Sequence, residues 1–249
     1  MNNKKAQLTI FIILAIIIVS AIIVFFLLIK PDSEIPQEIN PKTSVQKCVK
    51  GAIELSIQKI LDNGGILGSK KSVQYDGENY TFLCYQADYY LSCYNLFPML
   101  NEIIEEEIKS DTKTEVQNCF NLMKEDFEGK GFSVSGGATN YSIEIVPGGI
   151  NVKLDKKMQI SKEESSQNFE NFDTNIISSL YELIKISKEI VNSESEYCNF
   201  EYNGFMLLYP KFKIWRIEYN NNRIYKVIDR VSGNEFKFSV RSCAYPPGI

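Results

Sequence analysis

The sequence predicts an α+β protein in which one N-terminal transmembrane helix is followed by a disulfide-stapled ectodomain of helices and antiparallel sheet. Three observations predict this class: an apolar run near the N-terminus, six cysteines that all follow it, and apolar spacing that is helical in some segments and alternating in others. The expected segments are a cytoplasmic N-terminus (1–7), a transmembrane helix (8–29), a proline-rich stalk (30–43), a mainly helical subdomain with a small hairpin (44–130) and a β-rich subdomain with one long helix (131–249).

The apolar run extends from Leu8 to Ile29 and contains no charged residue, proline or glycine. Its 22 residues would form a helix of about 33 Å, enough to cross the hydrocarbon core of a bilayer. Lys4 and Lys5 precede the run, whereas the residues after Lys30 are mainly acidic. Because positive charge near a span stays in the cytoplasm, we expect residues 1–7 inside and residues 31–249 outside a cell membrane.

The end of the apolar run offers no small-x-small site for an ordinary signal peptidase, so a retained anchor is favoured over a cleaved signal peptide. At its start, the basic pair Lys4-Lys5, the small Ala6 and Gln7 directly precede the helix. This pattern resembles the signal of archaeal type IV pilin-like proteins. The resemblance implies prepilin peptidase cleavage between Ala6 and Gln7, and an uncut signal anchor stays open beside it.

Charge limits the partners of the ectodomain. Of the 27 basic residues, three lie in the first thirty positions, which leaves 24 basic against 31 acidic side chains, a net charge of −7. Binding of nucleic acid needs clustered lysine and arginine, so nucleic acid is not expected as a partner. The expected partners are the lipid bilayer through residues 8–29 and, in an assembly, further copies of the chain or other surface subunits.

Six cysteines on the outer side of a membrane predict three disulfides. Two of them lie on apolar faces of predicted helices, two stand nine positions apart around a short loop, and two flank the terminal strands. The predicted pairs are Cys48–Cys119, Cys84–Cys93 and Cys198–Cys243.

Helical spacing dominates residues 44–130. Thr43 or Ser44 is expected to cap a helix that ends at Asn63-Gly64-Gly65. A hairpin of strands 72–75 and 80–85 is expected around a turn at 76–79. A helix from Pro98 to about Ile108 follows, and Asp111 is expected to cap a further helix.

Alternating apolar residues dominate the rest of the chain. Residues 141–145 and 150–154 predict an antiparallel hairpin around Pro147-Gly148-Gly149. A polar loop is expected at Ser161–Asn168, and Asp173 or Thr174 is expected to cap the long helix of this part. Four terminal strands are expected at residues 205–209, 214–219, 223–229 and 235–241. The second half is also similar to uncharacterised archaeal surface proteins, and this resemblance implies location only.

Catalytic motifs are largely missing. The chain has no histidine, which excludes Ser-His-Asp and Cys-His catalysis and histidine-containing zinc centres. No phosphate-binding glycine motif occurs, so we expect no cofactor, no metal and no enzymatic activity. A hydrolase that uses paired carboxylates stays as an alternative, because such pairs meet only in the folded chain.

Two further features point to surface functions. Tyr85, Tyr89, Tyr90 and Tyr94 surround the short Cys84–Cys93 loop and could form an aromatic patch that binds sugar or protein, or could be ordinary strand and core aromatics. Glycosylation triplets begin at Asn79 and Asn140. The sequence thus favours a single-pass cell-surface protein with a structural or interaction ectodomain, either a pilin-like assembly subunit or a solitary adhesion or ligand-binding module.

Overall fold

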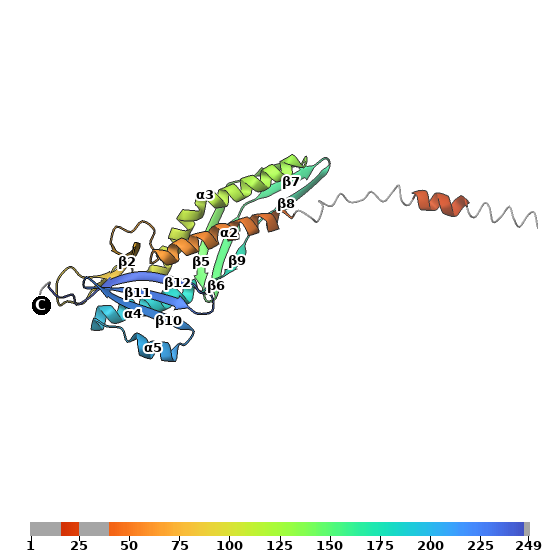
Figure 1. Cartoon of the computed structure of the whole chain (residues 1–249). Helices are drawn as coiled ribbons and strands as arrows, with labels where there is room; N and C mark the ends of the chain where they lie inside the picture. The colour runs from red at the N-terminus through yellow and green to blue at the C-terminus, as the bar shows by residue number, and fades with distance from the viewer. Residues whose placement is uncertain (1–15, 25–39, 247–249) are drawn as a thin grey trace, which may run out of the picture. The chain divides into compact units, whose positions relative to one another are not determined.

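The computed structural model describes residues 16–24 and 40–246, and the chain divides into two units, Met1–Asn40 and Pro41–Ile249 (Figure 1). In the first unit, residues 16–24 form a helix with exposed side chains. Within the described ranges no helix is both long and apolar enough to cross a membrane. Most of the expected span 8–29, the Ala6–Gln7 peptide bond and most of the stalk 30–43 lie outside the described residues.

The second unit has the expected α+β class. Its two long helices are α2 (Pro41–Asp62) and α3 (Leu100–Gly129), which pack against each other along their lengths (Figure 1). The Cys48–Cys119 disulfide joins them. The chain therefore enters this unit through a helix that is covalently fixed to its neighbour.

The start of α2 lies earlier than predicted. The helix begins at Pro41, because proline suits the first helical position, where its missing N–H has no partner to lose. Residues 41–43, which were expected in the stalk, are therefore helical, and neither Thr43 nor Ser44 is the cap. The predicted stop is confirmed: the backbone of Gly64 and Gly65 turns at positive φ after the last helical residue.

One helix replaces the two predicted between residues 98 and 130. α3 is continuous over 30 residues, so the predicted break at Asp111 is wrong. No glycine or proline interrupts it before its end, and its buried stripe continues through Ile108, Thr112 and Val116. The carboxylate of Asp111 accepts hydrogen bonds from Lys59 of α2 at 3.0 Å instead of capping a helix.

The main sheet contains residues from both ends of the second unit. Its strand order is β1-β2-β12-β11-β10. The short strand β3 also pairs with β2, at the last two residues of β2. β2 and β12 are parallel, and the other pairs are antiparallel. The segments 44–130 and 131–249 therefore share one sheet. The strands are β1 (Ser72–Tyr75), β2 (Glu78–Tyr85), β3 (Tyr94–Asn95), β10 (Phe212–Tyr219), β11 (Asn222–Asp229) and β12 (Glu235–Arg241).

Two smaller antiparallel sheets lie along the helices, with strand orders β4-β7-β8 and β5-β6-β9 (Figure 1). The predicted hairpin 141–154 is confirmed as β5 and β6, and its apolar side packs against α3. The strands are β4 (Ser133–Gly136), β5 (Asn140–Val146), β6 (Gly149–Asp155), β7 (Met158–Lys162), β8 (Ser165–Phe169) and β9 (Thr174–Ile177).

Two predictions in this region are wrong. The polar loop predicted at 161–168 is instead part of the β7–β8 hairpin, whose strands pair in register from Met158–Phe169 to Lys162–Ser165. Asp173 caps no helix: its carboxylate accepts the backbone N–H of Leu154 at 2.8 Å, and the chain continues as strand β9.

The helix predicted from Asp173 starts later, as α4 (Leu180–Tyr197). The expected strand 205–209 is instead the short helix α5 (Tyr202–Leu208), because the Glu201 carboxylate accepts the N–H groups of Asn203 and Gly204 and so caps a helix. α4 packs its buried apolar face on β11 and β12 and forms the core under the main sheet.

All six cysteines are paired in the predicted combinations. The Cα–Cα distances of 5.7, 5.4 and 5.7 Å lie within the usual range for disulfides. Cys48–Cys119 joins the two long helices, whereas Cys84–Cys93 and Cys198–Cys243 fix the loops beyond one end of the main sheet.

Candidate interaction surface

Of the four tyrosines singled out in the sequence, Tyr85 ends β2 and Tyr94 begins β3, and the other two lie on the loop between these strands, which Cys84–Cys93 closes at its base. Tyr90 is 55% exposed and Tyr94 is 71% exposed, and Tyr89 is also exposed. Tyr85 does not join them, because it is half-buried between the ring of Phe82 and the ammonium group of Lys71. Three of the four predicted tyrosines therefore face solvent.

The C-terminal segment adds a residue that the sequence analysis missed. Tyr245 is 57% exposed, and its ring meets that of Tyr90 edge-on with centroids 5.5 Å apart. The backbone holds the two segments together: Tyr90 N–H donates to Ala244 O, and Cys243 N–H donates to Leu91 O. The order of residues along the chain gives no sign of this contact, because it joins positions more than 150 apart.

We define the tyrosine surface as the exposed side chains of these two segments. Its members are Tyr89, Tyr90, Leu91, Tyr94 and Tyr245. The guanidinium group of Arg241 lies over the Tyr89 ring, 5.8 Å from its centroid, so a cation borders the aromatic group. Such rings combine a large apolar area with a polar hydroxyl and few rotatable bonds, which suits them to recognition.

The backbone at Tyr90 is strained. Its φ angle of 62° lies in the left-handed region, where a bulky side chain is disfavoured by about 1–2 kcal/mol. The Cys84–Cys93 bridge and the hydrogen bond to Ala244 hold this conformation. Strain of this kind is found preferentially at sites where a side chain must be presented in one orientation.

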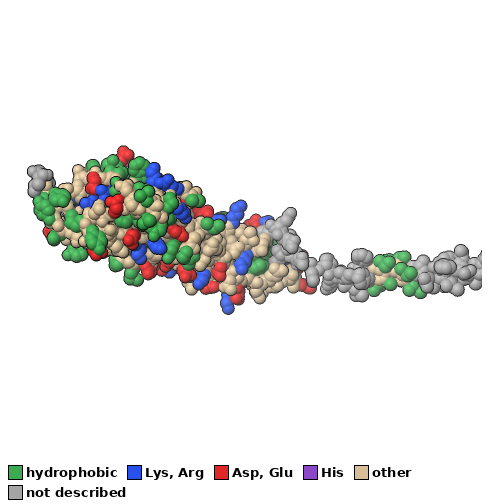
Figure 2. Space-filling view, turned by 90° about the horizontal axis from the view of Figure 1, so that it is seen from below, with side chains coloured by type: hydrophobic (Ala, Val, Ile, Leu, Met, Phe, Trp, Pro, Cys, Tyr) green, Lys and Arg blue, Asp and Glu red, His purple; other side chains and the backbone are tan. Residues whose placement is uncertain are grey.

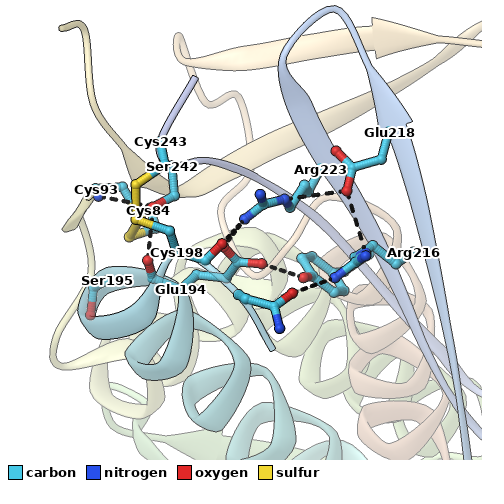
Figure 3. Close-up of polar contacts among 12 residues, drawn as sticks. Cys84, Cys93, Glu194, Ser195, Cys198, Arg216, Glu218, Arg223, Ser242 and Cys243 are labelled. Atoms are coloured by element: carbon cyan, nitrogen blue, oxygen red, sulfur yellow. Dashed lines mark hydrogen bonds and ion pairs between the residues drawn. A yellow bond between two sulfur atoms is a disulfide. The ribbon is translucent and has the colours of Figure 1, made fainter. Parts of the chain in front are cut away.

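A polar network centred on a buried carboxylate lies beside the two disulfides that hold these segments (Figure 3). Glu194 of α4 is 0% exposed; its carboxylate accepts hydrogen bonds from Arg223 and from the hydroxyl of Tyr225, both on β11. Burial, and then the charge of Glu194, raise the pKa of Tyr225 well above its usual range, so this hydroxyl stays a donor. The network fixes the end of α4 to the sheet.

Ser242 connects this network to both nearby disulfides. Its hydroxyl donates to the backbone carbonyl of Glu194 at 2.8 Å and accepts the N–H of Cys93 at 3.2 Å (Figure 3). Arg223 also donates to the carbonyl of Cys198. The loop that carries the tyrosines, the C-terminal segment and the end of α4 are therefore tied together by two disulfides and buried hydrogen bonds.

The tyrosine surface lies at the opposite end of the second unit from Pro41, where the chain enters (Figure 1). α2 alone spans about 33 Å of this separation. Figure 2 shows hydrophobic side chains gathered over the half of this unit that contains the main sheet, whereas charged and polar atoms dominate near the entry of the chain.

No three cysteine, aspartate or glutamate side chains in residues 16–24 and 40–246 come together in a way that could hold a metal ion. One hollow of about 590 Å³ follows α3 beside Met99, Glu102 and Ile103, and it is shallow and open. Glu105 does not line this hollow; it is half-buried, and its carboxylate accepts the N–H of Ile145 at 2.8 Å.

Comparisons with known proteins add no relative: no family model, no curated protein and no solved structure matches this chain. The function is therefore inferred from the residues and from their arrangement in space.

Proposed function

We propose that this chain is a single-pass cell-surface protein that binds a partner outside the cell through its tyrosine surface. The observation that carries the proposal is the group of exposed tyrosines on two disulfide-anchored segments, with Tyr90 held at a positive φ angle by the Cys84–Cys93 bridge and a backbone hydrogen bond. The apolar run 8–29 serves as the anchor, and residues 31–249 form the extracytoplasmic part. Three disulfides support this orientation, since such bonds persist in oxidising compartments.

The arrangement favours binding over chemistry. The surface contains aromatic rings and one neighbouring arginine, but no carboxylate pair or nucleophile that would define a reaction. Rigid tyrosines lose little conformational entropy when they bind, so each contributes more to affinity than a flexible side chain of similar area. An anchored binding or adhesion module uses these properties directly.

A binding assay tests the proposal. Full-length protein in lipid vesicles is mixed with envelopes isolated from its own cells, and the bound vesicles are counted. We expect binding by the wild type and an affinity at least about tenfold lower for the triple variant Tyr89→Ser, Tyr90→Ser and Tyr94→Ser. Removing a tyrosine that becomes buried at the centre of an interface commonly costs more than about 1 kcal/mol of binding free energy.

The matched control carries Tyr209→Ser, which removes an exposed tyrosine beside α5, away from the disulfide-bonded loops. This variant should bind as the wild type does. Equal binding by wild type and triple variant, or no binding by the wild type, would refute the role assigned to the tyrosine surface.

A pilin-like assembly subunit is the second candidate. It is favoured by Lys4-Lys5-Ala6-Gln7 directly before the apolar run, which would pack with other copies after cleavage. Mass spectrometry of the mature N-terminus separates the candidates. A chain that starts at Gln7 and is recovered in filaments supports the assembly subunit, and a chain that starts at Met1 or Asn2 and is recovered in membranes excludes it.

A further inference from the structure

Two glycosylation triplets occur in the described part of the ectodomain, Asn79-Tyr80-Thr81 and Asn140-Tyr141-Ser142. A transferase that attaches sugar to such a triplet must reach both the asparagine amide and the hydroxyl two residues later. The fold presents the two triplets differently, so it distinguishes two sites that look equivalent in the sequence.

In the Asn140 triplet, both the asparagine and the serine are accessible to solvent. It begins β5, and because alternate residues of a strand share a face, Asn140 and Ser142 point to the same side. Both side chains are exposed, whereas Tyr141 between them turns inward, where its hydroxyl donates to the carbonyl of Lys109 on α3. The asparagine amide and the serine hydroxyl are therefore accessible together on the solvent-facing side of the strand.

The surroundings of Asn140 have room for a hydrated group. The outward face of the β5-β6-β9 sheet is polar: Ser142 lies opposite Lys153, and Glu144 lies opposite Asn151. Glu144 and Lys153 form an exposed ion pair at 3.8 Å. Its one strongly exposed apolar residue is Ile177, which pairs in register with Gly149 at the far end of the sheet. A sugar chain on Asn140 would cover no apolar contact of the fold.

In the Asn79 triplet, the asparagine is accessible to solvent and the threonine is not. Asn79 is exposed near the start of β2, but Thr81 is 3% exposed and packs against the backbone at Gly64. Glu78, which directly precedes the triplet, accepts hydrogen bonds on its carboxylate from Lys237 at 3.0 Å and from Lys226 at 3.3 Å. In the folded protein the hydroxyl of Thr81 is therefore inaccessible to an enzyme.

From this contrast we propose that Asn140 is an N-glycosylation site of the folded protein and that Asn79 is not. The Nδ2 atom of Asn140 attacks the anomeric carbon of a lipid-linked oligosaccharide. The carbon–oxygen bond to the polyprenyl phosphate breaks, the new nitrogen–carbon bond forms, the phosphate leaves with the bonding electrons, and the amide proton passes to a base of the transferase. The inference rests on the proposed extracytoplasmic location, where such donors are used.

The test uses full-length protein purified from its own cells. Glycopeptide mass spectrometry measures the occupancy of Asn140 and Asn79 in the wild type and in Asn140→Gln, Ser142→Ala and Asn79→Gln. We expect sugar on Asn140 alone, its complete loss in the first two variants, and no change in Asn79→Gln. Because Ser142→Ala keeps the asparagine, loss in this variant shows recognition of the whole triplet.

The outcomes separate this inference from the proposed function. Free thiols are counted on the same wild-type sample, and surface exposure is measured by labelling of intact cells. Unmodified Asn140 in protein that is oxidised and surface-labelled overturns the glycosylation inference and leaves the location intact. Sugar on Asn79 would overturn the argument that burial of Thr81 blocks the transferase. Free thiols together with the absence of surface label would overturn the extracytoplasmic location, on which the glycosylation inference and the proposed function both rest.

Discussion

Removal of the disulfide between the two long helices should cost the second unit a large part of its stability. The change is the double substitution Cys48→Ala and Cys119→Ala, which takes away a bond between residues 71 apart in the chain. In the chain-entropy treatment, a loop of this length stabilises the folded state by about 4 kcal/mol. The same treatment gives about 2.5 kcal/mol for Cys84–Cys93, whose cysteines are only nine positions apart.

Urea unfolding of residues 31–249, followed by circular dichroism, measures both variants against the wild type. The helical signal is suitable because α2 and α3 supply most of the helical residues of this unit. We expect the loss to be larger for the Cys48–Cys119 variant, with a steeper dependence on urea because the unfolded chain is less constrained. A loss below about 1 kcal/mol, or one smaller than that of the Cys84–Cys93 variant, would refute the reasoning.

Three further predictions concern single side chains. Glu194→Ala should destabilise the fold by about 3 kcal/mol in urea unfolding, because it takes the buried carboxylate partner away from the half-buried Arg223 and from the buried hydroxyl of Tyr225. Hydrogen bonds from Tyr80 and Lys237 lower the pKa of Glu78 from 4.5 to about 2, so its contribution is full above pH 4.5 and disappears as the pH falls toward 2. Since the Glu78 side chain is 45% exposed, Glu78→Gln should remove only about 1 kcal/mol of acid-sensitive stability, measured by unfolding between pH 2 and 6. Gly65→Ala should cost about 2–4 kcal/mol, because a methyl group there would lie 2.8 Å from Ile104 at positive φ.

Each of these has its own control or contrary result. For Gly65→Ala the control is Gly51→Ala, which meets nothing within 4 Å inside α2 and should stabilise by about 0.5–1 kcal/mol; equal effects at the two glycines would contradict the packing. If Glu194→Ala left the free energy of unfolding unchanged, water would have replaced Glu194 as the hydrogen-bond partner of Arg223, which would contradict the prediction. Identical acid unfolding of Glu78→Gln and wild type would remove Glu78 as the acid-sensitive group.

The local pattern of the sequence predicted much of the fold because it records which face of each element is buried. The stop of α2, the β5–β6 hairpin and the last three strands follow from periodicity and glycine positions. The disulfide pairs followed too: two cysteines lie on apolar helix faces, two stand nine positions apart around a short loop, and two flank the terminal strands. In each of these cases the deciding contacts are local or lie on one recognisable face.

The errors arose where a distant residue decides the structure. Asp111 looked like a cap, yet its carboxylate binds Lys59 of another helix. Asp173 also looked like a cap, yet it accepts the N–H of Leu154. The parallel pairing of β2 with β12 joins residues more than 150 positions apart, and no local signal marks it.

The candidate site shows the same division. Three of the predicted tyrosines are exposed, because a short disulfide loop has too little volume to bury them all. Tyr245 joins them only through the fold, and burial of Thr81, which separates the two glycosylation triplets, depends on the packing of Gly64 against β2.

The most direct test of the central claim is surface labelling of intact cells that produce the full chain. A membrane-impermeant amine reagent is added before lysis, the cells are fractionated, and labelled lysines are located by mass spectrometry. An anchored surface protein should be found in the membrane fraction with label on exposed residues such as Lys153 and Lys157. Label that appears only after lysis, or a chain recovered without membranes, would contradict the claim.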